Sequence, residues 1–282
     1  MTRVVCGGLV ALDLVMDVVA HPTAGEKHRA TASRLSAGGG ACNAAAAIVR
    51  LGGHAMLAGT LGDDALGEIL RAQIRALGID DSLLHTSKKT RTAYSAITIT
   101  PDGERTIVNF RDDSAMNTPC PLSDGLSFGA ALSDTRFPAM AAALMCAARR
   151  AGVPGIMDAE APVAPAALAL REASHTAFSS QGLQDFAGGT DGRALAEARL
   201  HLGNWVSVTR GPAPVLCHDG GTLIEVPVPE VTPTDTLGAG DTWHGAFALT
   251  LARGATEVEA VQAANAAAAN MICRVPPWDA PT

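Results

Sequence analysis

The stretch DTLGAGDTWHGAF, residues 235–247, places small residues directly before an acid: Gly238, Ala239 and Gly240 precede Asp241. Backbone N–H groups that small side chains leave accessible can hold an anion, and a carboxylate beside them can act as a base. The same residues also suit an ordinary helix start, because glycine fits a loop and aspartate is a favoured N-cap. This stretch alone favours the helix start, because caps are far more common than catalytic acids, and the rest of the chain must decide.

Other candidate residues follow predicted strands or open a predicted helix. In an open parallel sheet, ligands bind beyond the carboxyl ends of the strands, so residues at these places are expected to share one cleft. They are Asp13 after the first strand (3–12), the glycine loop 38–40 with Asn43 behind it, Arg136 after AALSD, Asp158 and Glu160 after VPGIM, and Thr209-Arg210-Gly211 after WVSV.

These residues need a scaffold, and the pattern after residue 130 predicts one. Short β-rich runs alternate there with helical stretches, which is typical of a parallel sheet covered by helices on both faces. The early β-rich pieces, about 13–35 and 91–110, do not follow this rhythm. We expect them to form a separate small sheet that projects from the main body, with the Pro-Asp-Gly turn at 101–103 closing a hairpin.

The composition of the chain limits the classes of partner that the protein is expected to bind. The chain of 282 residues has a formal net charge of -7, and its lysines and arginines form no basic run, which argues against nucleic acid and anionic membranes. The six cysteines form no C-x-x-C pair, and the histidines lack metal-ligand spacing. No apolar run is long enough for a membrane span. We therefore expect a cytoplasmic protein with reduced thiols.

Two long stretches carry a resemblance to a known family. GGGACNAAAAIVRLGGHAMLAGTLGDDALGEIL, from residue 38, is similar to the first signature of the ribokinase-like (PfkB-type) sugar kinases, and DTLGAGDTWHGAF is similar to the second. The resemblance covers nearly the whole chain. It implies one ribokinase-like α/β domain over residues 1–282, with a lid formed by about 13–35 and 91–112.

The resemblance also implies a role for each residue of the two signatures. Asp241 would be the catalytic base, and the amides of Gly238, Ala239 and Gly240 would form the anion hole. The implied cofactors are ATP and Mg²⁺. Residues expected to hold the sugar are Asp13, Gly38, Gly39 and Asn43. Without the family, Asp13 is equally a strand-end cap and Asn43 a first-turn helix residue.

Asn109 and Arg136 match positions that face the substrate in the sulfofructose kinase and ketohexokinase branches. An arginine in a sugar cleft suggests an anionic substituent, because a guanidinium pairs with phosphate, sulfonate or carboxylate. The resemblance thus points to a ketohexose or an anionic derivative, such as 6-sulfofructose or a fructose phosphate. A surface role for Arg136 is the alternative, and 2-keto-3-deoxygluconate, ribose or a nucleoside stays open as substrate.

On the nucleotide side, the resemblance assigns phosphate contacts to Thr209 and Gly211 and an adenine contact to Asn265, which is otherwise an ordinary helix residue. Two features depart from the family. The N-x-x-E that helps to organise Mg²⁺ is replaced by SSQG, residues 179–182, and the chain ends early, at RVPPWDAPT. Asp235, followed by Thr236, matches part of the potassium site that some members have.

Two other functions compete with the kinase. A non-catalytic sugar- or nucleotide-responsive module would explain the missing N-x-x-E, but it would have no need of the intact GAGD. A dinucleotide-binding oxidoreductase is suggested by CGGLV, but no G-x-G-x-x-G follows that strand. The exposed face of the predicted small sheet would need cover, which favours a homodimer through the lid.

Overall fold

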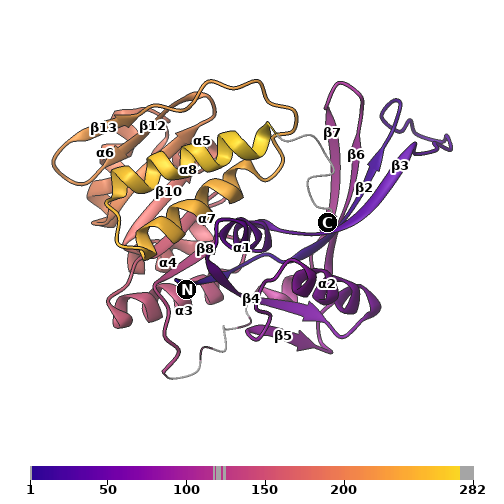
Figure 1. The fold of residues 1–282 in the computed structure, drawn as a ribbon, viewed down its shortest axis with the longest axis horizontal. Helices are drawn as coiled ribbons and strands as arrows, with labels where there is room; N and C mark the ends of the chain where they lie inside the picture. Colours follow the sequence, from indigo (N-terminus) through magenta and orange to yellow (C-terminus); the bar gives the residue numbers. More distant parts are fainter. Residues whose placement is uncertain (1, 117, 119–121, 123–124, 274–282) are drawn as a thin grey trace.

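The computed structural model describes residues 2–116, 118, 122 and 125–273. In this part of the chain two sheets stand side by side, a large one covered by helices and a small one at its edge (Figure 1). The spatial order of the nine strands in the large sheet is β13 (Leu223–Val226), β12 (Ala213–His218), β11 (Trp205–Arg210), β10 (His175–Ser179), β9 (Gly155–Ala159), β8 (Ala130–Asp134), β1 (Arg3–Gly7), β4 (His54–Gly62) and β5 (Leu84–Ser87).

The large sheet is parallel except at one edge, where β12 and β13 run antiparallel to their neighbours. Alternate strand residues point to opposite faces, so that Val4 and Cys6 of β1 join one hydrophobic core and Val5 joins the other. Helices α1 (Gly40–Arg50), α2 (Ala65–Ala76), α7 (Ala239–Ala252) and α8 (Glu257–Ile272) build the first core. Helices α3 (Pro138–Ala151), α4 (Ala167–Glu172), α5 (Ser180–Ala187) and α6 (Gly192–Leu202) build the second. The predicted doubly covered sheet is confirmed.

The small sheet has the order β3 (Ala32–Gly38), β2 (Ala11–Asp17), β6 (Ala93–Ile99) and β7 (Arg105–Phe110). Its strands come from the two segments that broke the sequence rhythm. β2 pairs parallel with β6 and antiparallel with β3, and β6 forms a hairpin with β7. The separate small sheet expected from the sequence is therefore present.

One strand boundary was predicted wrongly. The sequence suggests a single strand over 3–12, but β1 ends at Gly7 and β2 begins at Ala11 in the other sheet. Gly8 lies between them with a φ of 145°, and a Cβ there would collide with the buried carboxylate of Asp134. The chain therefore leaves the large sheet at Gly8, and Asp13 lies inside the small sheet rather than at the end of β1.

Cys6, Cys42, Cys146, Cys217 and Cys273 are free thiols. Among the described residues, no helix is both long and apolar enough to cross a membrane.

Candidate active site

The two glycine-rich signatures meet because helices α1 and α7 pack unusually closely. A Cβ on Gly245 of α7 would lie 2.5 Å from the carbonyl oxygen of Ala44 in α1, so only glycine fits at this crossing. The alanine side chains of α1 are small and let its backbone come close to α7. The Asn43 side chain, at the start of α1, consequently reaches the first turn of α7.

Asp241 lies in that first turn and does not cap the helix. The N-cap is Gly238, with a left-handed φ of 76°, and no side chain in the described part of the chain caps α7. Instead, Asn43 Nδ2 donates to Asp241 Oδ2 at 2.8 Å. Among the described residues nothing donates to Oδ1, which faces the side-chain-free Cα of Gly40. The cap interpretation of the sequence is thus wrong, and one carboxylate oxygen is left for a ligand.

Burial raises the pKa of Asp241 to about 7, with a further increase from the negative charge of Asp158. The hydrogen bond from Asn43 acts in the opposite direction and favours the ionised form. A carboxyl group with a pKa near neutral pH is well matched to accept a proton from a hydroxyl and later release it. Burial and the neighbouring acid therefore tune Asp241 for proton transfer.

The residues before Asp241 present backbone amides to the same space. Within the described chain, the N–H groups of Gly238 and Gly240 have no hydrogen-bond partner outside the helix, and that of Ala239 makes a 3.3 Å turn contact with Thr236 O. His244 Nδ1 lies 2.8 Å from Gly240 O and must carry the proton, because a carbonyl only accepts. This bond fixes the first turn, whose free amides and helix dipole suit an anion.

Asp13 faces this turn from the small sheet. It pairs with Ser36 of β3 and Ser95 of β6, and Ser95 pairs in turn with Asn109 of β7, so these four side chains form one row on one face. Gly38 leaves room for the Asp13 carboxylate, since a Cβ there would lie 2.0 Å from Oδ2. Partial burial raises the pKa of Asp13, and the Ser95 hydroxyl counteracts it.

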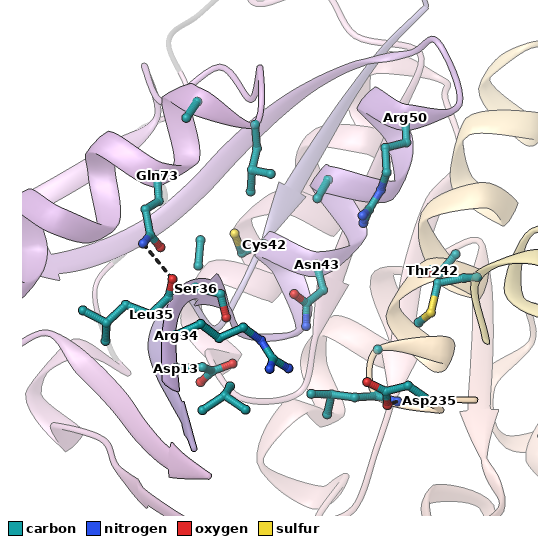
Figure 2. A pocket seen from close by; sticks show the side chains of 18 residues that line it. Asp13, Arg34, Leu35, Ser36, Cys42, Asn43, Arg50, Gln73, Asp235 and Thr242 are labelled. Atoms are coloured by element: carbon teal, nitrogen blue, oxygen red, sulfur yellow. Dashed lines mark hydrogen bonds between the residues drawn. The ribbon is translucent and has the colours of Figure 1, made fainter. Parts of the chain in front are cut away.

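A cavity of about 260 Å³ opens beside these residues (Figure 2). Asp13 and Arg34 of the small sheet face it from one side, and Asn43 and Cys42 of α1 face it from another (Figure 2). Gly38 and Gly39 lie at the junction; Gly39 has a φ of 89° and touches the Leu9 backbone so closely that a Cβ would clash. The cavity is thus shared between the small sheet and the start of α1.

Arg136 follows β8 in the sequence, and an ion pair holds its side chain in place. Its Nη2 lies 2.5 Å from Glu160 Oε2, and its Nη1 donates to Ala161 O at 3.0 Å. Burial lowers the pKa of Arg111, which follows β7, and the nearby positive charge of Arg136 lowers it further. Two guanidinium groups thus gather near one another with Glu160, and Asn109 is exposed two residues before Arg111.

Sequence reasoning missed Asp134, the last residue of β8, because it passed over the acid in favour of the neighbouring arginine. Asp134 Oδ2 accepts from Leu9 N at 2.8 Å, and Oδ1 accepts from Arg136 N at 2.9 Å. Asp134 and Asp241 lie on either side of Gly40: a Cβ on Gly40 would lie 3.5 Å from Asp134 Oδ2 and 3.3 Å from Asp241 Oδ1. Burial raises the pKa of Asp134. The sequence signal that could have identified Asp134 is its position at the carboxyl end of a predicted strand.

The nucleotide-side candidates lie farther along the sheet. Thr209 ends the parallel part of β11, and Gly211 follows in the turn with a φ of 61°. Asn265 is only 3% exposed; its amide accepts from Trp243 Nε1 at 2.8 Å and donates to Pro227 O at 3.0 Å. These bonds give it a structural role, and its contact with adenine stays a prediction. The tail 274–282 lies outside the described residues.

No group of three or more acidic, histidine or cysteine side chains among the described residues could hold a metal ion. At the position matching the family's missing glutamate, a Cβ on Gly182 would collide with Ala159 O. Asp235 is already engaged: Arg105 Nη2 lies 2.7 Å from its Oδ1.

Comparison with known proteins gives matches that extend over most of the chain. The model of the pfkB family of carbohydrate kinases matches residues 1–276. A crystal structure from Agrobacterium tumefaciens, provisionally described as a ribokinase, is 32% identical with a TM-score of 0.91, covering 96% of this chain and 91% of that one.

Two curated relatives show how the similarity is distributed. Ribokinase from Bacillus subtilis is 26% identical over 271 residues, which cover 94% of this chain and 91% of that protein. Fructokinase-1 from Oryza sativa is 42% identical over only 78 residues, 28% of this chain and 24% of that protein. Of these two similarities, the one to the ribokinase extends over 94% of the chain, whereas the one to the fructokinase is local.

Proposed function

The chain belongs to the pfkB family of carbohydrate kinases, and on this premise we propose that it transfers the γ-phosphate of ATP to a sugar hydroxyl, with Asp241 as the base. The observation that carries this proposal is the 2.8 Å hydrogen bond between Asn43 and Asp241. It joins the expected sugar loop to the expected base and leaves Oδ1 of Asp241 free for the hydroxyl.

Each group has a physical task in this reaction. Asp13 and Asn43 would hold the sugar, because a carboxylate accepts hydrogen bonds from hydroxyl groups and an amide both donates and accepts hydrogen bonds. Asp241 Oδ1 would accept the proton of the attacking hydroxyl. The amides of Gly238, Ala239 and Gly240 would stabilise negative charge on the transferred phosphoryl group, with the positive end of the α7 dipole behind them.

For the substrate, we propose an anionic ketohexose derivative, such as 6-sulfofructose or a fructose phosphate. The support is the pair of guanidinium groups on Arg111 and Arg136, with Asn109 nearby. Glu160 balances one of these charges, so an incoming anion would compete with it for Arg136. Neutral fructose, ribose, 2-keto-3-deoxygluconate and nucleosides are the alternatives, two of which correspond to the names of the relatives.

A screen of ATP consumption tests both the proposed kinase activity and the proposed substrate class. It would cover ketohexoses, sugar phosphates, sulfosugars, ribose, 2-keto-3-deoxygluconate and nucleosides. We expect ADP formation with at least one sugar and the highest kcat/KM with an anionic ketohexose. A higher kcat/KM with a neutral sugar would contradict the substrate class. No ADP with any compound would favour a non-catalytic module on this fold.

We further propose that the small sheet pairs with that of a second copy. On the face opposite Asp13, Leu14 pairs with Leu35, and Val108 is aligned with them across β6. All three are exposed, Val108 by 67%. An exposed apolar sheet face of this kind favours association. Sedimentation should give a dimer for the native chain and a monomer for the Leu35→Asp, Val108→Asp variant; a native monomer would overturn this proposal.

A further inference from the structure

The side chain of Arg105 links the small sheet to the loop before α7. Its Nη2 lies 2.7 Å from Asp235 Oδ1 and 3.4 Å from Thr236 Oγ1, across 130 residues of sequence. Both charged side chains are largely shielded, Arg105 being 22% exposed and Asp235 17%. A partly buried ion pair is weakened less by salt than a surface one. The ion pair joins the small sheet to the loop before α7, and both of these parts line the cavity.

The pair also fixes the chain that leads into the proposed anion hole. Asp235 Oδ1 accepts from Leu237 N at 2.8 Å, in addition to Arg105. On the other side, Asp235 N contacts Ile272 O of α8 at 3.3 Å. Gly238, which follows Leu237, has the left-handed conformation at the start of α7. Arg105 thus braces the turn from which the free amides project.

A monovalent cation at Asp235 would compete with the contacts that this carboxylate already makes. Asp235 Oδ1 already accepts from the guanidinium of Arg105 and from the backbone amide of Leu237. A potassium ion there would also face the full positive charge of Arg105 at short range, which is repulsive. The sequence-based match of Asp235 and Thr236 to a potassium site is therefore not supported by the contacts of these residues.

We propose that Arg105 is a positioning residue which supplies the positive charge beside the anion hole and holds the small sheet closed over it. This role rests on the proposed phosphoryl transfer at the same site. Arg105 acts through Asp235 on the turn 235–238 and touches no reacting atom. We therefore expect turnover by the native chain to be independent of potassium.

The test compares the native chain with Arg105→Ala, Arg105→Lys and the control Arg29→Ala, an exposed arginine in the β2–β3 connection of the same small sheet. Phosphorylation rates are measured in potassium, sodium and tetramethylammonium chloride. The native rate should be the same in all three salts. Arg105→Ala should lose about 10- to 100-fold in kcat, since small displacements of catalytic groups have effects of this size. Added guanidinium ion should restore part of it, Arg105→Lys should be intermediate, and Arg29→Ala unchanged.

Hydrogen exchange of the peptide covering 235–241 gives a readout that needs no turnover. We expect faster exchange there in Arg105→Ala and native protection in Arg29→Ala. Potassium activation of the native chain, or unchanged exchange and kcat in Arg105→Ala, would overturn the inference. If no sugar is phosphorylated, the proposed function fails, and the exchange experiment alone still decides whether Arg105 braces the turn.

Discussion

Asn43 and Asp241 are 198 residues apart in sequence, and their side chains meet at 2.8 Å. The contact is possible because Gly245 lets α7 approach the backbone of α1 at Ala44. It sets the position of the proposed base relative to the sugar loop, and it opposes the effect of burial on the charge of the base, since the amide donor favours the carboxylate form.

The first prediction concerns Asn43→Ala. Loss of a hydrogen bond to a charged group costs about 1.5–3 kcal/mol, and each 1.36 kcal/mol is one pKa unit, so the pKa of Asp241 should rise by about one unit or more. Activity needs the ionised base, and the acid limb of the pH–rate profile should therefore move to higher pH. Asn43→Asp, which places a second carboxylate there, should move it further. An unshifted acid limb in Asn43→Ala would contradict the tuning role of Asn43.

The second prediction links the same pKa to stability. Because the folded-state pKa of Asp241 is about 7 and its ordinary value is 3.8, folding favours the protonated form. This carboxyl group therefore costs the native chain stability increasingly as pH rises from about 4, and fully above about 7. Asp241→Asn removes the cost, so its melting temperature should exceed the native one by more at pH 8 than at pH 5. A difference independent of pH would argue against the raised pKa.

The third prediction tests the helix crossing. Gly245→Ala should destabilise the chain by about 1–3 kcal/mol, the usual cost of overpacking, and should lower kcat by moving Asn43 away from Asp241. Gly221→Ala is the control, since a Cβ there meets only an Asp219 oxygen at 3.6 Å and the residue has no positive φ. Chemical unfolding and steady-state rates would measure both effects. Equal stability of the two variants would show that the close approach is not needed.

The fourth prediction addresses the substrate. If Arg111 and Arg136 recognise an anion, Arg111→Ala and Arg136→Ala should each raise KM for the anionic ketohexose more than for the neutral sugar. A charge-assisted contact is worth about 1.5–3 kcal/mol, or roughly 10- to 100-fold. Arg193→Ala, an exposed arginine of α6, should change neither value. Equal effects on both sugars would show that the arginines do not read the charge.

Much of this site could be predicted from sequence, because its chemistry lies in two contiguous glycine-rich stretches. The alternation of strands and helices also fixed the large sheet and set the small one apart. The end of the first strand was misplaced, since the break at Gly8 depends on the buried carboxylate of Asp134, a contact from a distant strand. The bond between Asn43 and Asp241 depends on a helix crossing that no local pattern specifies.

The pairing of Arg105 with Asp235 was equally invisible, because it needs the small sheet to lie over the loop before α7. Local pattern matching assigned Asp235 to a cation. Charge partners that are far apart in sequence can only be recognised once the sheets are placed relative to each other. The same reason explains why the sequence suggested Arg136 as a free anion-binding group, when Glu160 already pairs with it.

The most direct test is the single-turnover rate of phosphoryl transfer in Asp241→Asn with the best substrate of the screen. General-base catalysis contributes about 10²- to 10⁴-fold, so the rate should fall by at least the lower figure. Calorimetry should show sugar and MgATP binding close to native. A near-native rate in a folded Asp241→Asn protein would contradict the assignment of Asp241 as the base.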